Sequence, residues 1–307
     1  MDGLLIVDKP RGMSSHDVVA RARRLLREKR IGHAGTLDPL ATGVLVLCVG
    51  QATRLSEYLL GEDKAYEGVI RLGERTTTDD AEGQVVEARP VPPITPERLR
   101  QLEAQFTGAI AQVPPQFSAI QKGGQRAYAL ARQGRQVELE PRRVMVYELQ
   151  LMPSDGEEAA EVGHLRIVVR CSAGAYIRAL ARDIGEALGC GGHLVALRRT
   201  QAGRFTLADA ITLERIEAAA GEGSAAALLL PMDRAVADWP AAHLSDDDAR
   251  RLRMGQAIAL PSAAMPRAAH APGVRVYDSR CAFIAIAHWD GMKLKPAKVF
   301  DAAPPLV

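Results

Sequence analysis

Long apolar runs are missing from this chain of 307 residues. The apolar run from Val44 to Val49 has the length of a strand, whereas a bilayer-spanning helix needs about 18–20 apolar residues. The N-terminus also lacks a basic segment followed by an apolar one, so a signal peptide is not expected. Together these absences favour a cytoplasmic protein with no membrane partner.

Cysteine is scarce, and the four cysteines lie far apart in the sequence. No two of them have C-x-x-C spacing, which argues against zinc-ribbon and redox-dithiol motifs. A disulfide framework is not expected either in a chain of this length without an export signal. All four are expected to be small buried hydrophobic residues: Cys48, Cys171, Cys190 and Cys281. The seven histidines show no metal-ligand spacing, so no metal is expected.

Common catalytic motifs are also absent. There is no G-x-x-x-x-G-K-[ST] phosphate loop, no G-x-S-x-G elbow and no H-E-x-x-H zinc motif. The stretch from Gly189 to Gly192 is rich in glycine but does not fit G-x-G-x-x-G, and we interpret it as a turn between a helix and a strand. No nucleotide or redox cofactor is expected.

Charge of one sign is not in large excess, because the net charge is only +2. The charges are nevertheless segregated: basic residues gather at 11–30, 122–143 and 178–204, and acidic ones at 79–80 and 246–248. Two interpretations are open. The basic stretches either form a face that attracts phosphates, or they are ordinary solvated helix faces.

The pattern of apolar residues predicts a mixed α+β fold rather than a doubly wound parallel one. Predicted strands cover 3–8, 44–49, 65–72, 144–151, 164–171, 194–199 and 204–207. Predicted helices cover 15–26, 53–60, 95–106, 127–133 and 175–188. Loops are expected at 31–43 and 73–83, and an exposed excursion at 111–124.

The texture of the sequence changes between Pro231 and Pro240. Beyond this point a short polar helix is predicted at 244–255, an irregular stretch at 261–272, and strands at 274–277, 282–287 and 293–299. This would make a small β-rich unit of about 65 residues, a size at which independent folding is marginal.

The loop from Gly32 to Gly43 is the most distinctive segment of the chain. Its glycines, threonines and a proline predict a defined backbone path with His33 and Asp38 at its centre. An Asp in such a loop is commonly a turn or cap residue. The functional alternative is a carboxylate aimed into a cleft as a nucleophile, a general base or a metal ligand.

A second distinctive segment runs from Cys171 to Arg178, at the junction of a predicted strand and a predicted helix. Tyr176 and Arg178 would diverge by roughly 200° on an ideal helix. They can therefore share a site only if the helix begins irregularly. The alternative is a core aromatic and a surface charge, although tyrosine is scarce here, with only six in the chain.

Taken together, these segments resemble the TruB family, the bacterial synthases that make pseudouridine 55 in the T-loop of tRNA. The resemblance is strong over residues 3–240 and weak beyond them. The segments that carry it are Gly3–Pro10 with Gly12–Ser15, Gly32–Gly43, Asp63–Glu67, Cys171–Arg178, and Leu188–His193 with Leu197–Thr200.

The resemblance implies a pseudouridine synthase catalytic domain over 1–240, with a mixed, mainly antiparallel sheet and a tRNA-clasping insertion at about 111–143. It implies a PUA-like RNA-binding domain over 241–307. Asp38 would be the essential carboxylate and Arg178 its partner, and Lys9 and Pro10 would be structural. The remaining implied site residues contact the base or its stack: Tyr66, Tyr176, Leu197 and His33.

The implied substrate is the T-stem-loop of tRNA, bound by a monomer. Two alternatives stay open. One is a non-catalytic tRNA binder or folding chaperone that uses the same cleft, and the other is a glycosidase-type hydrolase acting on a nucleoside.

Overall fold

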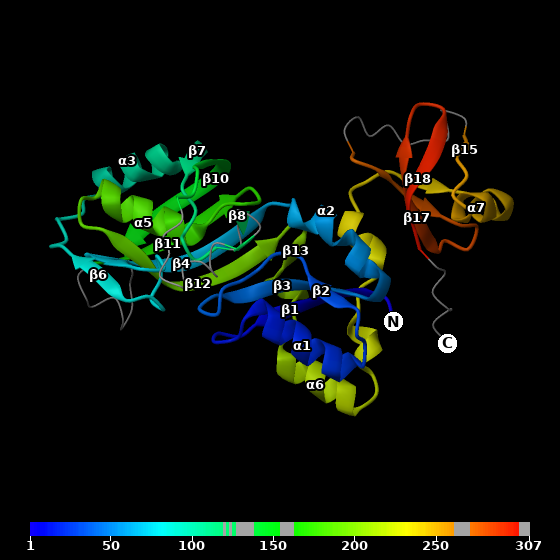
Figure 1. The fold of residues 1–307 in the computed structure, drawn as a ribbon, viewed down its shortest axis with the longest axis horizontal. Coiled ribbons are helices and arrows are strands. Elements are labelled where there is room, and N and C mark those ends of the chain that lie inside the picture. The colour runs from blue at the N-terminus through cyan, green and yellow to red at the C-terminus, as the bar shows by residue number, and fades with distance from the viewer. Residues whose placement is uncertain (119–120, 123–124, 127–137, 154–162, 261–270, 301–307) are drawn as a thin grey trace.

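A computed structural model describes residues 1–118, 121–122, 125–126, 138–153, 163–260 and 271–300. Strands between Gly3 and Thr206 build one large sheet, and strands from Ala241 onward build a smaller sheet beside it (Figure 1). The helix predicted over 127–133 and most of the irregular stretch predicted over 261–272 lie outside the described residues.

The large sheet has nine strands in the order β1-β3-β12-β4-β11-β10-β7, with β2 beside β3 and β13 beside β12. Its strands are β1 (Gly3–Lys9), β2 (Ile31–His33), β3 (Thr42–Val49), β4 (Lys64–Leu72), β7 (Gly108–Gln112), β10 (Arg142–Pro153), β11 (His164–Cys171), β12 (Gly192–Ala202) and β13 (Phe205–Thr206). Among the described pairings of this sheet only β3 with β12 is parallel. The predicted mixed, mainly antiparallel sheet is confirmed.

Strand β3 is apolar and buried from Val44 to Val49 because both of its faces are covered. Leu45, Leu47 and Val49 pack into the core beneath α1 (Ser15–Leu26). Val44, Val46 and Cys48 alternate with them and pack into a second core on the other face. By contrast, β4 alternates buried and half-buried residues, as a strand with one covered face does.

Two predicted loops contain short strands. Residues 31–33 of the predicted loop 31–43 form β2, which pairs with Leu47–Val49. The predicted loop 73–83 begins with β5 (Glu74–Thr76), which pairs with β6 (Val85–Ala88). Strands β2 and β5 have only three residues each, and hydrogen bonds to partner strands define them. Three residues are too few to show the alternation of apolar and polar residues by which a strand is predicted.

Two of the longer helices begin with side-chain caps. Ser14 caps α1 through a capping box with Asp17, and Thr95 caps α3 (Pro96–Phe106). In Figure 1, α1 lies beside α6 (Leu213–Gly221) at one end of the large sheet, and α3 and α5 (Ile177–Ala187) cover the other end. None of the helices in the described ranges is long and apolar enough to cross a membrane.

Short helical turns and a short hairpin connect these elements. The helix predicted over 53–60 is a 3₁₀ turn followed by an α-helix. These and the remaining connecting elements are η1 (Gly50–Leu55), α2 (Ser56–Leu60), β8 (Gln121–Lys122), β9 (Gln125–Arg126), η2 (Leu207–Asp209), η3 (Ala225–Leu228) and η4 (Met232–Val236).

The smaller sheet has five strands in the order β14-β16-β17-β18-β15, and α7 packs against it. Its elements are β14 (Ala241–His243), α7 (Asp246–Arg253), β15 (Ile258–Ala259), β16 (Val274–Tyr277), β17 (Phe283–Trp289) and β18 (Lys293–Val299). The three predicted strands and the polar helix are confirmed. The expectation of four buried cysteines is wrong for Cys281, which is exposed because it lies in the turn between β16 and β17.

Candidate active site

The loop that joins β2 to β3 carries Asp38 and is fastened to α1. The hydroxyl of Ser15, the first residue of the helix, accepts a hydrogen bond from the Leu37 N–H at 2.8 Å and donates to the Leu37 carbonyl at 3.0 Å. Ser15 and Leu37 are both buried. The residue directly before Asp38 is therefore fixed in place by the start of a helix.

Lys9 holds the same loop from β1. Its side chain is fully buried, and its ammonium group donates to the carbonyls of Pro10, Met13 and Pro39. Burial lowers the pKa of Lys9 to about 8. Since its described hydrogen-bond partners are all backbone carbonyls next to the loop, Lys9 has the contacts of a structural residue.

Arg199 on β12 holds the loop from the opposite side. Its guanidinium donates from Nε to the Val44 carbonyl at 2.7 Å and from Nη2 to the Gly35 carbonyl at 3.1 Å. The backbones also come very close: a Cβ on Gly43 would lie 2.2 Å from the Arg199 carbonyl oxygen. Gly43 has a φ of 97°, so only glycine fits this position without strain.

Asp38 is paired with Arg178, as the resemblance implies. Nε of Arg178 lies 2.9 Å from Oδ2 of Asp38, and the arginine side chain is only 6% exposed. The Asp38 side chain retains 39% exposure because it faces a cavity. Burial raises the pKa of Asp38, and the Arg178 guanidinium opposes that rise by favouring the carboxylate.

A second carboxylate, Asp80, lies behind the same arginine. Nη1 of Arg178 is 3.4 Å from Oδ2 of Asp80 and donates to the Thr78 carbonyl at 2.9 Å. The Asp80 side chain is 3% exposed, so it is closed off from the cavity that Asp38 faces. The two carboxylates on Arg178 therefore differ in exposure: Asp38 faces the cavity, and Asp80 is buried behind the arginine.

Tyr176 and Arg178 reach one site because the helix begins later than predicted. Tyr176 has extended dihedrals, φ −109° and ψ 111°, and α5 begins at Ile177 instead of Ala175. The Tyr176 backbone exchanges two hydrogen bonds with the Gln112 side chain, at 2.8 and 3.0 Å. The helical divergence of 100° per residue therefore does not apply between Tyr176 and Arg178.

A cavity of about 320 Å³ opens in front of Asp38. Five of the six predicted site residues line it: Asp38, Tyr66, Tyr176, Arg178 and Leu197. Burial raises the pKa of Tyr66, while the Arg199 guanidinium acts in the opposite direction. The phenol of Tyr66 is thus protonated at neutral pH and lies at the wall of the cavity.

His33, the sixth predicted site residue, lies on β2 and is not among the described residues that line the cavity. Its ring packs edge-on against His16, with centroids 5.2 Å apart. Burial, reinforced by His16 and Arg199, lowers the pKa of His33 to about 4. His33 is therefore an uncharged, flat side chain beside the loop of Asp38.

Asp80, Arg199 and Lys64 also belong to this site, although no sequence motif predicted them there. Lys64 lines the cavity and donates to the carbonyls of Leu60 and Glu62. The Thr- and Asp-rich composition of residues 76–80 was the available signal for Asp80. No local signal distinguishes Arg199, because a buried arginine inside a strand is recognised only from its partners.

The third basic stretch does not form a solvent-facing surface throughout. Arg178 and Arg199 are buried, and Arg182 is 17% exposed and paired with Asp79. Neither interpretation of that stretch, as a phosphate-binding face or as a solvated helix face, holds for these three residues. Their charges are directed at carboxylates and carbonyls inside the molecule.

Comparison with known proteins gives matches to three consecutive family models. The models are TruB family pseudouridylate synthase (N-terminal domain) over residues 23–177, tRNA pseudouridylate synthase B C-terminal domain over 178–237, and pseudouridine synthase II TruB, C-terminal, over 240–300. The chain belongs to the TruB family. The family that the sequence motifs resemble is thereby confirmed.

Close relatives and a solved structure agree with this TruB assignment. tRNA pseudouridine synthase B of Ralstonia pickettii is 48% identical over 305 residues, covering 97% of this chain and 93% of that protein. The Arthrobacter protein of the same name is 47% identical and covers 98% and 97%. A crystal structure of a Cbf5-Nop10-Gar1 complex matches with a TM-score of 0.72 at 25% identity, covering 98% of this chain and 85% of that one.

Within the described ranges, no group of three or more His, Cys, Asp or Glu side chains is placed to hold a metal ion. The side chains around the cavity of this TruB protein instead provide one carboxylate, two guanidinium groups, one ammonium group, two phenols and aliphatic hydroxyl groups. That set suits proton transfer and nucleophilic attack.

Proposed function

We propose that this chain isomerises uridine to pseudouridine at position 55 in the T-loop of tRNA. The observation that carries the proposal is the ion pair of Asp38 with Arg178. The Asp38 carboxylate faces a cavity that Tyr66 also lines. Membership of the TruB family and relatives named tRNA pseudouridine synthase B support the same reaction and substrate.

The reaction makes limited demands on the protein. The N1–C1′ bond breaks, the base turns, and a C5–C1′ bond forms. The C5 hydrogen leaves as a proton and N1 gains one, so atoms and electrons balance without an oxidant or reductant. Asp38 would attack the sugar or C6, or remove a sugar proton to begin elimination, and Arg178 would favour its ionised form. Tyr66 is a candidate carrier for the C5 proton.

The target base must first leave its stack in the folded loop, which costs a few kcal/mol. His33 would occupy the vacated place, and its pKa of about 4 means that it would do so as a neutral ring. Tyr176 and Leu197 would border the extruded base, because both line the cavity with Asp38.

The test is tritium release from tRNA that carries [5-³H]uridine. The wild type and Asp247→Asn, a control at a side chain that is 83% exposed, are expected to release tritium, whereas Asp38→Asn should bind tRNA but not turn it over. Turnover by Asp38→Asn would refute the central role of Asp38. Binding without release by the wild type would favour the binder or chaperone, and free uracil would favour the hydrolase.

We infer a corresponding division of the chain: catalytic residues 1–240, including a tRNA-clasping insertion at about 111–143, and a PUA-like RNA-binding part over 241–307. The change of sheet at Ala241 supports this division. The T-stem-loop would be the bound portion of tRNA, and the enzyme would act as a cytoplasmic monomer.

A further inference from the structure

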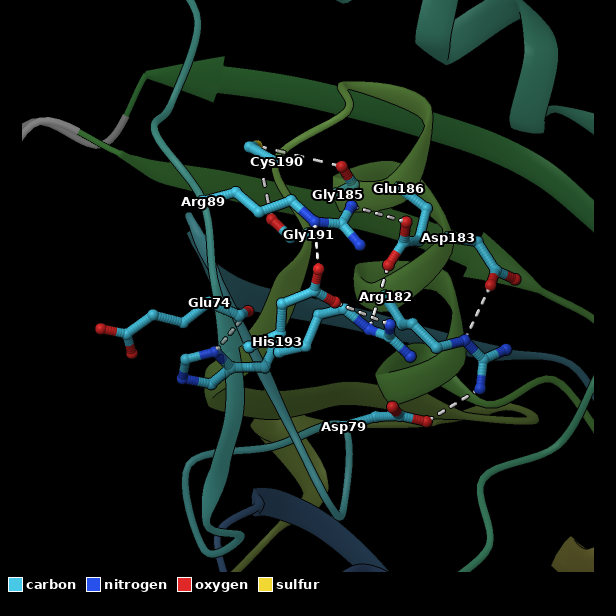
Figure 2. Close-up of polar contacts among 12 residues, drawn as sticks. Glu74, Asp79, Arg89, Arg182, Asp183, Gly185, Glu186, Cys190, Gly191 and His193 are labelled. Atoms are coloured by element: carbon cyan, nitrogen blue, oxygen red, sulfur yellow. Dashed lines mark hydrogen bonds and ion pairs between the residues drawn. The ribbon is translucent and has the colours of Figure 1, made fainter.

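A second arginine of α5 reaches the turn that supports Arg178. Arg182 lies one helical turn after Arg178, so both side chains leave the same face of the helix. Nη1 of Arg182 is 2.9 Å from Oδ2 of Asp79, a contact drawn in Figure 2. Arg178 contacts the residues on either side, Thr78 and Asp80. Three consecutive residues are thus held by two arginines.

Asp79 has the most strained backbone conformation of that turn. Its φ of 59° lies in the left-handed region, which is disfavoured for residues with a Cβ. The side chains of Asp79 and Arg182 are only 16% and 17% exposed, so water screens their attraction weakly. The Asp79 carbonyl accepts from the Leu194 N–H at 3.1 Å, which fixes the turn against β12 as well.

Arg182 has no described contact with the reacting space. Its other partners are the Asp183 carboxylate at 2.9 Å and the Val113 carbonyl at 2.8 Å. Among the described residues that line the cavity, neither Arg182 nor Asp79 is included. An effect of Asp79 on the reaction would therefore pass through the turn and Arg178. Arg182 has a second route through Val113, which is next to the Gln112 that bonds Tyr176, so Asp79→Asn is the variant that tests the turn alone.

We propose that the Arg182–Asp79 ion pair is a positioning pair for catalysis: it holds the Thr78–Asp80 turn against α5 and so orients the Arg178 guanidinium toward Asp38. This inference rests on the proposed function, because it concerns the ion pair that the reaction would use. The single guanidinium of Arg178 contacts Asp38, Asp80 and two backbone carbonyls. Because Arg182 also binds the turn, the position of the turn does not depend on Arg178 alone.

Arg89 provides a matched control. It joins α5 to the hairpin of β5 and β6, whose connection contains the Thr78–Asp80 turn. Arg89 pairs with Glu87 of β6 at 2.6 Å and with Glu186 of α5 at 3.1 Å. The Arg89–Glu186 contact is visible in Figure 2. This pair is more exposed, at 32% and 39%, and it does not involve the Thr78–Asp80 turn. Loss of Arg89 therefore tests bracing of the hairpin in general.

The readout is the pH dependence of tritium release, which reports the ionisation of Asp38. Charged or titratable groups that act on Asp38 come from several elements: Arg178 of α5, Asp80 and Glu82 of the turn, Lys9 of β1, Tyr66 of β4 and Tyr176 before α5. The effect of Arg178 exceeds that of Asp80. Looser positioning of Arg178 should therefore raise the pKa of Asp38 and move the acid limb to higher pH.

The experiment compares Asp79→Asn, Arg182→Gln, their double variant and Arg89→Gln with the wild type in steady-state assays on [5-³H]uridine tRNA. Misplacing a catalytic group by about 1 Å can cost about 100-fold in rate. We expect each single variant to lose about 10- to 100-fold in kcat with an unchanged KM, and to shift the acid limb upward. The double variant should lose no more than either single one, and Arg89→Gln should match the wild type.

Unchanged kcat and pH profile in Asp79→Asn would overturn the inference, as would equal losses in Arg89→Gln. If Arg182→Gln does not fold, Arg182→Lys provides the second measurement, since it keeps a cation opposite Asp79 and should retain more activity than Asp79→Asn. A wild type that releases no tritium would instead refute the proposed function, so the two failures are distinguishable.

Discussion

At the scale of single residues, the guanidinium of Arg178 joins parts of the chain that are far apart. It contacts Asp38, the carbonyls of Thr78 and Phe117, and Asp80. A guanidinium presents five N–H groups in one rigid plane, whereas a lysine ammonium is a compact charge with three donors. Lysine at position 178 would keep the charge and lose most of this network.

We expect Arg178→Lys to lower kcat by about 100-fold, because Asp38 would lose its oriented partner. The pKa of Asp38, already raised by burial, would be opposed less and would rise further. Because the proposed mechanism uses the carboxylate of Asp38, the rate should fall as the pH drops through that pKa, and the acid limb should move to higher pH. A pH profile of tritium release checks this. Arg166→Lys, at a 52% exposed side chain, is the control, and an unmoved limb in Arg178→Lys would contradict the argument.

The role of the Tyr66 hydroxyl can be tested separately from the role of its ring. Tyr66→Phe removes only the hydroxyl and keeps the buried ring against the cavity. If the phenol carries the C5 proton, tritium release should slow by about 100-fold or more while tRNA affinity stays the same. Tyr147→Phe, at an exposed tyrosine that bonds Asp63, controls for loss of a hydroxyl. An unchanged rate in Tyr66→Phe would assign the proton to another group.

At the scale of elements, the Asp38 loop depends on a close approach between β3 and β12. These two strands form the parallel pairing of the large sheet, with Gly43 opposite Arg199. The approach brings the guanidinium of Arg199 within reach of the carbonyls of Val44 and Gly35. The pairing of β3 with β12 therefore requires glycine at position 43, and the same pairing places Arg199 against the Asp38 loop.

Gly43→Ala should be severely destabilising. The left-handed φ costs about 1–3 kcal/mol for a residue with a Cβ, and the clash with the Arg199 carbonyl adds about 1–3 kcal/mol. Gly12→Ala is the matched control, because Gly12 has a φ of 87° but nothing within 4 Å of its added Cβ. Urea unfolding of both variants separates strain from clash. Equal losses in the two would show that the approach of Arg199 is unimportant.

At the scale of the whole molecule, one hydrophobic cluster contains residues of both sheets, although each sheet also has a cluster of its own. Phe300 and Ile286 from the C-terminal part pack in the same cluster as Leu4 and Val46 of the large sheet. Lys298 pairs with Glu57 of α2, across the same boundary. The C-terminal part is thus packed against the catalytic part in addition to any role in binding RNA.

Phe300→Ala should lower the free energy of unfolding by about 3–5 kcal/mol, because it removes a fully buried phenyl ring from the shared core. Urea unfolding followed by far-UV circular dichroism, which reports both sheets, should show a single transition at a lower midpoint. Met292→Ala, at a 70% exposed side chain, should leave the midpoint unchanged. Two transitions, with that of the large sheet unmoved, would indicate independent domains.

Removal of the residues after Pro240 tests the same coupling. When this part is absent, the apolar surface of the shared cluster is exposed to water. We therefore expect truncation to lower the stability of the catalytic part along with tRNA affinity. Catalytic activity on saturating tRNA and a melting temperature equal to those of the full chain would contradict this.

Much of this protein can be read from local sequence. The apolar run of β3 and the alternation of β4 are short-range signals, and each predicted its element. The motif around Asp38 and the motif ending at Arg178 carried the family resemblance, because both consist of unusual residues in a fixed order. These features depend on neighbours within a few positions in the chain.

Tertiary structure alone decided how the site is assembled. The late start of α5, which lets Tyr176 and Arg178 share a cavity, depends on hydrogen bonds to Gln112. The burial of Asp80 and Arg199 depends on partners more than 90 residues away in the chain. The sequence by itself determined which residues are unusual and which elements form. Only packing determined which charges face each other, because the energy of a buried charge depends on its surroundings and not on its neighbours in sequence.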